Sequence, residues 1–227
     1  GLAGATFSAA SLIDPVYAAE LKEEINKIKH LSPEEAAQDE GFWRFIQQSY
    51  TVSATITNLN NGGVSPQPKV VQDAFERFNR LSNEAPSYYM WRILDNGREP
   101  IRQKLAHLAG CDPEEIAINR NTTEALETII FGLPLKEGDE IVLSKYDYPN
   151  MMNSWKQREK RDGLVLKYID LDMPMEDDKA IVKRFEAAFT AKTKIVHITH
   201  MINYTGQILP AKAITAAAHK KGIEVVL

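Results

Sequence analysis

From residue 115 onward, short runs of β-branched and apolar residues alternate with longer segments whose apolar residues recur at helical spacing. The predicted strands cover residues 116–119, 140–143, 164–169, 194–199 and 223–227, and the predicted helices cover about 122–132, 150–161, 176–190 and 210–221. Strands that alternate with helices in this way predict a mostly parallel sheet with helices on both faces. The predicted fold class is therefore α/β.

The first half of the chain has a different pattern, in which helical segments flank a loop rich in Asn, Gly and Pro. Helices are predicted over residues 14–30, 31–50, 66–81 and 88–108, the last with a bend at Asn96-Gly97. The loop TNLNNGGVSPQP, residues 57–68, carries turn formers that neither a helix nor a regular strand accommodates. We expect residues 1–57 to form an N-terminal helical arm that precedes the α/β body, residues 58–227.

Composition and charge narrow the function classes. The chain has 227 residues, is 44% hydrophobic, and carries 27 basic and 31 acidic residues mixed along its length. This balance argues against binding to nucleic acid or to an anionic membrane surface, and no apolar run has the length that spans a bilayer. Cys111 is the only cysteine, so no internal disulfide is expected. Residues 1–11 resemble the end of a secretion signal, so both a cytoplasmic protein and one exported to the periplasm are compatible with the sequence.

Candidate chemistry gathers in three loops that follow predicted strands, where ligands of parallel sheets bind. In the first loop, NRNTTE, Thr122 and Thr123 open a helix. A capping function explains them, because the first turn of a helix has unpaired amides. The loop taken alone favours the cap, and a phosphate site is the alternative, because those amides and the helix dipole attract anions.

The second and third loops add an aromatic ring and amide side chains. Tyr146 and Tyr148 follow one strand directly, and at least one of these rings is expected over the carboxyl edge of the sheet, either stacked on a flat ligand or filling a gap in the packing. His200, Asn203 and Gly206 lie in the third loop, THMINYTGQILP. Together the three loops offer what a flat, phosphorylated cofactor requires.

Other kinds of site fit less well. His197 and His200 are three residues apart in or near a strand, which places them on opposite faces, so no metal site is predicted there. The other histidines, His30, His107 and His219, are isolated on predicted helices. The sequence also lacks the Gly-rich motifs of dinucleotide and triphosphate sites and the nucleophile elbow of hydrolases.

Four motifs, TNLNNGGVSPQP, NRNTTEALETIIFGL, KYDYPNMMNSW and THMINYTGQILP, occur in the order and spacing of the class V aminotransferase family. The sequence resembles this family over roughly residues 55–227. The resemblance implies a fold-type-I enzyme that uses pyridoxal 5'-phosphate (PLP) and acts on an amino acid, as epimerase, desulfurase or lyase, or transaminase. It also implies a homodimer, since such enzymes build their sites at a dimer interface.

The resemblance also implies roles for individual residues. Thr122 and Thr123 match the residues that hold the cofactor phosphate, and Tyr148 matches the ring that stacks on the pyridine. Asn203 matches the Asn that hydrogen-bonds the phenolic oxygen of the cofactor, and Gly206 matches the tight turn beside it.

Two further matches and one departure complete the comparison. His200 matches a His that supports the Asn, and Asn61, Gly62 and Gly63 match a loop near the substrate. In the family, an Asp that pairs with the pyridine nitrogen and the Schiff-base Lys follow a strand like 223–227, whereas this sequence stops at Leu227. No catalytic residue is therefore assigned, and we expect the chain to be the first part of a longer enzyme. A non-catalytic phosphate-binding or interaction module and a flavodoxin-like binder of a phosphorylated ligand remain the alternatives.

Overall fold

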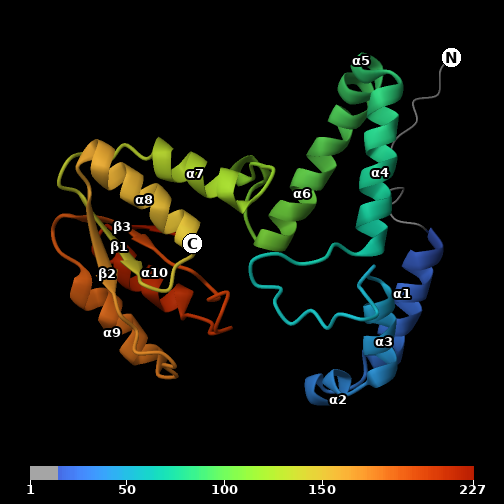
Figure 1. Cartoon of the computed structure of the whole chain (residues 1–227), viewed down its shortest axis with the longest axis horizontal. Coiled ribbons are helices and arrows are strands. Elements are labelled where there is room, and N and C mark those ends of the chain that lie inside the picture. The colour runs from blue at the N-terminus through green and yellow to red at the C-terminus, as the bar shows by residue number, and fades with distance from the viewer. Residues whose placement is uncertain (1–14) are drawn as a thin grey trace. The chain divides into compact units, whose positions relative to one another are not determined.

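The computed structural model describes residues 15–227, and the chain divides into two compact units (Figure 1). Unit 1 is Gly1–Ile118 and unit 2 is Asn119–Leu227. The interpretation of residues 1–11 as the end of a secretion signal falls outside the described residues, so the localisation stays a prediction. Within residues 15–227 no helix is both long enough and apolar enough to cross a membrane.

The described part of unit 1 is helical. Its helices are α1 (Pro15–Ile28), α2 (Pro33–Ala37), α3 (Glu40–Gln48), α4 (Lys69–Glu84), α5 (Pro86–Tyr88) and α6 (Arg98–Ala109), with a π-helix over Tyr89–Leu94 and 3-10 helices over Asp95–Gly97 and Pro113–Glu115. The helix predicted over residues 31–50 is in fact two helices, because the Asp39 side chain accepts a hydrogen bond from the Phe42 amide and caps a new start. The bend expected at Asn96-Gly97 coincides with the 3-10 segment.

The strand predicted over residues 116–119 is wrong. These residues form no helix or strand, and no described strand pairs with them. Ile118 is half exposed, whereas a sheet residue in an α/β fold is buried between layers. A run of β-branched residues forms a strand only when an adjacent strand supplies backbone hydrogen bonds. The sequence of the run does not show whether such a strand is present.

Unit 2 contains a parallel four-stranded sheet with the order β2-β1-β3-β4. Its strands are β1 (Glu140–Ser144), β2 (Val165–Ile169), β3 (Thr193–His197) and β4 (Glu224–Val226), and its helices are α7 (Thr122–Gly132), α8 (Pro149–Asp162), α9 (Asp178–Ala188) and α10 (Ala211–His219). Each of these elements matches a segment predicted from the sequence to within a few residues. The predicted α/β fold class is confirmed.

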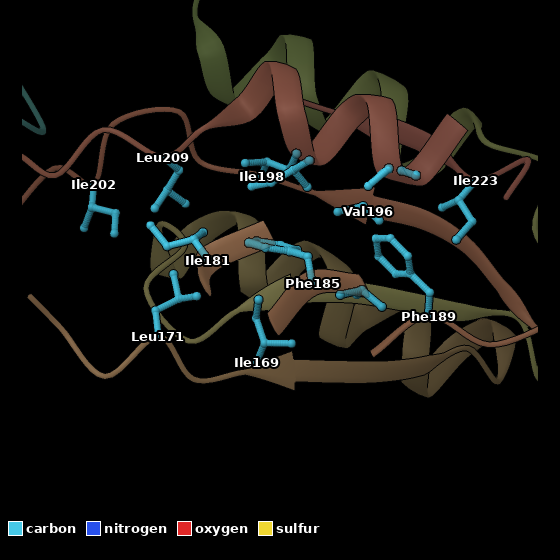
Figure 2. Packing of buried hydrophobic residues seen from close by; sticks show 14 residues of the cluster. Ile169, Leu171, Ile181, Phe185, Phe189, Val196, Ile198, Ile202, Leu209 and Ile223 are labelled. Carbon is cyan, nitrogen blue, oxygen red and sulfur yellow. The ribbon is translucent and has the colours of Figure 1, made fainter. Parts of the chain in front are cut away.

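Side chains of the central strands alternate between two separate cores. Ile141 and Ile195 point to a core that includes Trp155 of α8. Val142 and Val196 point to the opposite face, where they join residues of α9 and α10 (Figure 2). This second core also contains Ile169, Leu171, Ile181, Phe185, Phe189, Ile198, Ile202, Leu209, Ile214 and Ile223. A sheet buried on both faces explains why its strands read as nearly continuous apolar runs.

Helices α7 and α8 lie side by side and run in the same direction. The Ser154 hydroxyl donates to the Glu127 carboxylate (3.2 Å), and both residues lie in the second turn of their helices. The guanidinium of Arg158, in the third turn of α8, donates to the carbonyls of Ile130 (2.6 Å) and Leu133 (2.9 Å) at the end of α7. Residues later in α7 thus contact residues later in α8, which means that the two helices are parallel. Their first turns therefore lie at the same end of the sheet (Figure 1).

Changing Arg158 to Met is expected to lower the free energy of unfolding of unit 2 by about 2–4 kcal/mol, because a buried carbonyl and Asp162 lose a charged donor. Arg161→Met is the matched control, since Arg161 pairs with the same Asp162 but is 53% exposed, and should cost about 0–1 kcal/mol. With Trp43 and Trp91 changed to Phe, Trp155 is the only one of three tryptophans left, and its fluorescence follows unit 2 through a urea titration. Equal losses in the two variants would contradict the expectation.

Candidate functional site

The candidate site lies at the carboxyl edge of the sheet in unit 2. Strand β1 ends at Ser144 and its parallel neighbour β3 ends at His197. The loops that follow them, residues 145–148 and 198–210, therefore leave the sheet at the same edge, where parallel sheets bind their ligands.

A buried carboxyl group joins these two loops. Asp147 is 2% exposed. One of its carboxyl oxygens accepts a hydrogen bond from the Ser144 amide (2.7 Å), and the other accepts one from the Thr199 hydroxyl (2.5 Å). Burial raises the pKa of Asp147, while His197 and these hydrogen bonds act in the opposite direction. The sequence analysis did not single out Asp147 or Thr199.

His197, at the end of β3, is buried and interacts electrostatically with this carboxyl group. Its Nδ1 atom accepts a hydrogen bond from the indole N–H of Trp155 (3.3 Å), and both side chains are buried. Burial lowers the pKa of His197, and the nearby Asp147 opposes that shift. We assign His197 as neutral because an imidazole nitrogen that accepts an N–H bond carries no proton of its own. It is therefore a core residue that links β3 to α8.

The start of α7 presents donors that have no hydrogen-bond partner in the part of the chain that the structure describes. The Asn121 side chain accepts from the Glu124 amide (2.9 Å), so Asn121 is the helix cap. Within the described residues, the amides and hydroxyls of Thr122 and Thr123 have no hydrogen-bond partner, and both residues are exposed. Two amides, two hydroxyls and the positive end of the helix dipole remain available to an anion.

The two tyrosines of the second loop have different environments. The Tyr146 hydroxyl donates to Asp170 (3.2 Å), and its ring lies 6.4 Å from the ring of Tyr204. Tyr148 immediately precedes α8, is 39% exposed, and its phenol has no hydrogen-bond partner among the described residues. Tyr148 is thus the ring free to cover a ligand, and it lies at the same end of the sheet as Thr122 and Thr123.

The loop after β3 is held in a narrow hairpin. The amide of Ile202 donates to the carbonyl of Gln207 (2.9 Å), and the amide of Gly206 donates to the carbonyl of Ile202 (2.8 Å). Gly206 has a φ of 73°, in the left-handed region that glycine adopts without a steric penalty. Asn203 is half-buried within this turn, and His200 is exposed at its base.

The predicted substrate loop belongs to unit 1 and is described within that unit. Asn61 accepts a hydrogen bond from the Asn58 side chain (2.8 Å), and Asn61, Gly62 and Gly63 are exposed. The roles of these residues, like those assigned to the six candidate residues of unit 2, stay predictions. Among residues 15–227 there is no group of three or more His, Cys, Asp or Glu side chains arranged to hold a metal ion.

The family model for aminotransferase class V matches residues 57–227. The chain belongs to the class V aminotransferase family. It is 30% identical over 188 residues to isopenicillin N epimerase of Streptomyces clavuligerus, an alignment that covers 82% of this chain and 46% of the epimerase. It is 28% identical over 177 residues to a probable cysteine desulfurase of Synechocystis, with 74% of this chain and 41% of the relative covered.

Solved structures agree with the fold of this class V aminotransferase chain. A mutant of the cystine C-S lyase C-DES, with glycine covalently linked to its PLP cofactor, superposes with a TM-score of 0.66 at 22% identity and covers 79% of this chain and 48% of the other. The fold-type-I assignment that the sequence motifs implied is confirmed. This chain spans about half the length of the curated relatives it matches.

Proposed function

We propose that this chain supplies the cofactor-holding part of a PLP-dependent enzyme that acts on an amino acid. The observation that carries the proposal is the free anion site at the start of α7, at the same end of the sheet as the open ring of Tyr148. The donor set fits the cofactor, because two amides and two hydroxyls match a phosphate and an exposed phenol ring matches a flat heterocycle. The names of the relatives, an isopenicillin N epimerase and a probable cysteine desulfurase, support an amino-acid or peptide substrate.

Each candidate residue then has a defined task. Thr122 and Thr123 bind the phosphate, Tyr148 covers one face of the ring, and Asn203 donates its amide to the phenolic oxygen. Gly206 makes the turn that presents Asn203, and His200 supports the base of the same hairpin. When bound, PLP supplies an electron sink for negative charge that develops at the α-carbon of an amino acid.

We further propose that the protein works as a homodimer and that the loop Asn61–Gly63 lies near the substrate. The support for both is family membership. Epimerisation, transamination and elimination from the side chain all begin with loss of the α-hydrogen. Incorporation of deuterium at the α-carbon of L-amino acids in D₂O would therefore report the shared step before the substrate is known.

The proposed function is tested on the purified full-length protein incubated with PLP. We expect an absorption band near that of protein-bound PLP and, after reduction with sodium borohydride, a mass increase of one phosphopyridoxyl group on a lysine. A protein that shows neither the band nor the mass increase would overturn the enzyme proposal and leave a phosphate-binding or interaction module. If inorganic phosphate did not compete with PLP for binding to the cofactor-free protein, the assignment of the anion site would be overturned.

A further inference from the structure

The Asp147 carboxyl group receives donors from two segments that are far apart in the sequence. The Ser144 amide belongs to the end of β1, whereas the Thr199 hydroxyl comes from 52 residues beyond Asp147. Each donor bonds a different oxygen of the same carboxyl group. A rotation of this side chain would therefore break contacts with both loops at once.

On the β1 side, the carboxyl group fixes the turn that leads into α8. The Ser144 hydroxyl accepts from the Tyr146 amide (3.1 Å), so residues 144–147 close a tight turn around the carboxyl group. Tyr148 is the next residue and immediately precedes α8. Its ring is exposed and makes no polar contact among the described residues, so its place is set by its backbone.

On the β3 side, the carboxyl group fixes the base of the hairpin. Thr199 is followed directly by His200, whose carbonyl accepts from the Leu209 amide (2.8 Å) and closes the hairpin that contains Asn203. The buried pair His197 and Trp155 ties β3 to α8. Burial strengthens these polar contacts, because little water competes for the donors.

We propose that Asp147 is a positioning residue whose carboxyl group sets the separation between Tyr148 and the Asn203 hairpin across the carboxyl edge of the sheet. The proposal rests on the proposed function, in which Tyr148 covers a face of the PLP ring and Asn203 bonds the phenolic oxygen. Asp147 is buried and both of its carboxyl oxygens are bonded within the protein, so in this arrangement it acts through its neighbours.

The opposite edge of the same two strands supplies a matched comparison. There the buried Thr193 hydroxyl of β3 donates to the Glu140 carboxylate of β1 (3.1 Å). Both pairs join a Thr hydroxyl of the β3 segment to a carboxyl group of the β1 segment, but no candidate site residue lies at the Thr193 edge. If Thr199→Val acted only by destabilising the strands, Thr193→Val should have the same effect. A loss of positioning should appear only in Thr199→Val.

The first measurement is hydrogen exchange in the cofactor-free protein, for Thr199→Val, Thr193→Val and the conservative Thr199→Ser. We expect the hydrogen-bonded amides of the hairpin, those of Ile202, Gly206 and Leu209, to exchange about tenfold faster in Thr199→Val than in the parent, because one hydrogen bond to a carboxyl group is lost. Exchange in this segment should be unchanged in Thr193→Val and restored in Thr199→Ser. Equal exchange in Thr199→Val and the parent would overturn the proposal.

The second measurement is PLP binding and the circular dichroism of the bound cofactor in the full-length protein. Thr199→Val should bind PLP about tenfold more weakly and alter its dichroism, while Thr193→Val and Thr199→Ser keep the parent values. Faster exchange with unchanged affinity and dichroism would overturn the positioning role. If the parent binds no PLP, the proposed function is overturned, and with it the claim that Asp147 positions residues for PLP. The exchange data would still decide whether the carboxyl group holds the two loops together.

Discussion

Changing Thr122 and Thr123 together to Val is expected to weaken PLP binding by the full-length protein about 100-fold. The two hydroxyls have no protein partner among the described residues, so their loss removes two hydrogen bonds to a phosphate and nothing else. Hydrogen bonds to a charged group contribute about 1.5–3 kcal/mol each, so the loss of two costs at least about 3 kcal/mol, which corresponds to slightly more than 100-fold in affinity. Equilibrium titration followed by cofactor absorbance measures the change.

The same double variant should unfold with nearly the parent free energy, because Asn121, not a threonine, caps α7. The matched control is Thr128→Val, an exposed threonine of the same helix whose hydroxyl donates within the helix to the carbonyl of Glu124 (2.7 Å). This control should bind PLP as the parent does. An unchanged affinity in the double variant, or an equal loss in Thr128→Val, would show that the phosphate lies elsewhere.

The start of α7 contains a helix cap and two threonine hydroxyl groups, and the sequence alone did not show which residue has which role. The motif NRNTTE predicted a helix start with hydroxyls, and it left capping and phosphate binding as alternatives. The structure assigns the cap to the Asn121 side chain, and the threonine hydroxyls have no hydrogen-bond partner within residues 15–227. Only coordinates distinguish these outcomes, because Asn, Ser and Thr all cap helices and all precede anion sites.

The parallel sheet was predictable because its central strands β1 and β3 are buried on two faces and read as apolar runs with turn residues on both sides. The same reasoning failed for residues 116–119, which have the composition of a strand but no partner among the described strands. The amino-acid composition of a segment shows that it is suited to a sheet, whereas strand pairing depends on which segments lie beside it in the fold.

The contacts that hold the candidate site in place were not predicted from the sequence. Asp147 lies in a turn, where an Asp needs no further explanation, and Thr199 follows a strand, where a Thr is common. Their contact spans 52 residues, so neither position suggests the other. Side chains that face a ligand can be recognised in a sequence from their chemistry. The side chains that position them are recognised only from their contacts in the structure.

Changing Ile181 of α9 to Ala is expected to lower the free energy of unfolding of unit 2 by about 2–5 kcal/mol. Ile181 is fully buried among Leu171, Phe185 and Leu209, so the change opens a cavity in the core under the carboxyl edge of the sheet (Figure 2). The matched control is Ile129→Ala in α7, the same change in a helix residue that is 46% exposed.

The control should cost less than about 1 kcal/mol, because about half of its side chain already contacts water and Ala favours the helix. Both values come from urea unfolding followed by Trp155 fluorescence in the background without Trp43 and Trp91. Comparable losses would contradict the two-core arrangement, since Ile181 would then contribute no more burial than a surface residue. A large loss for Ile181→Ala alone would show that the core beneath the candidate site, and not the helix itself, stabilises α9.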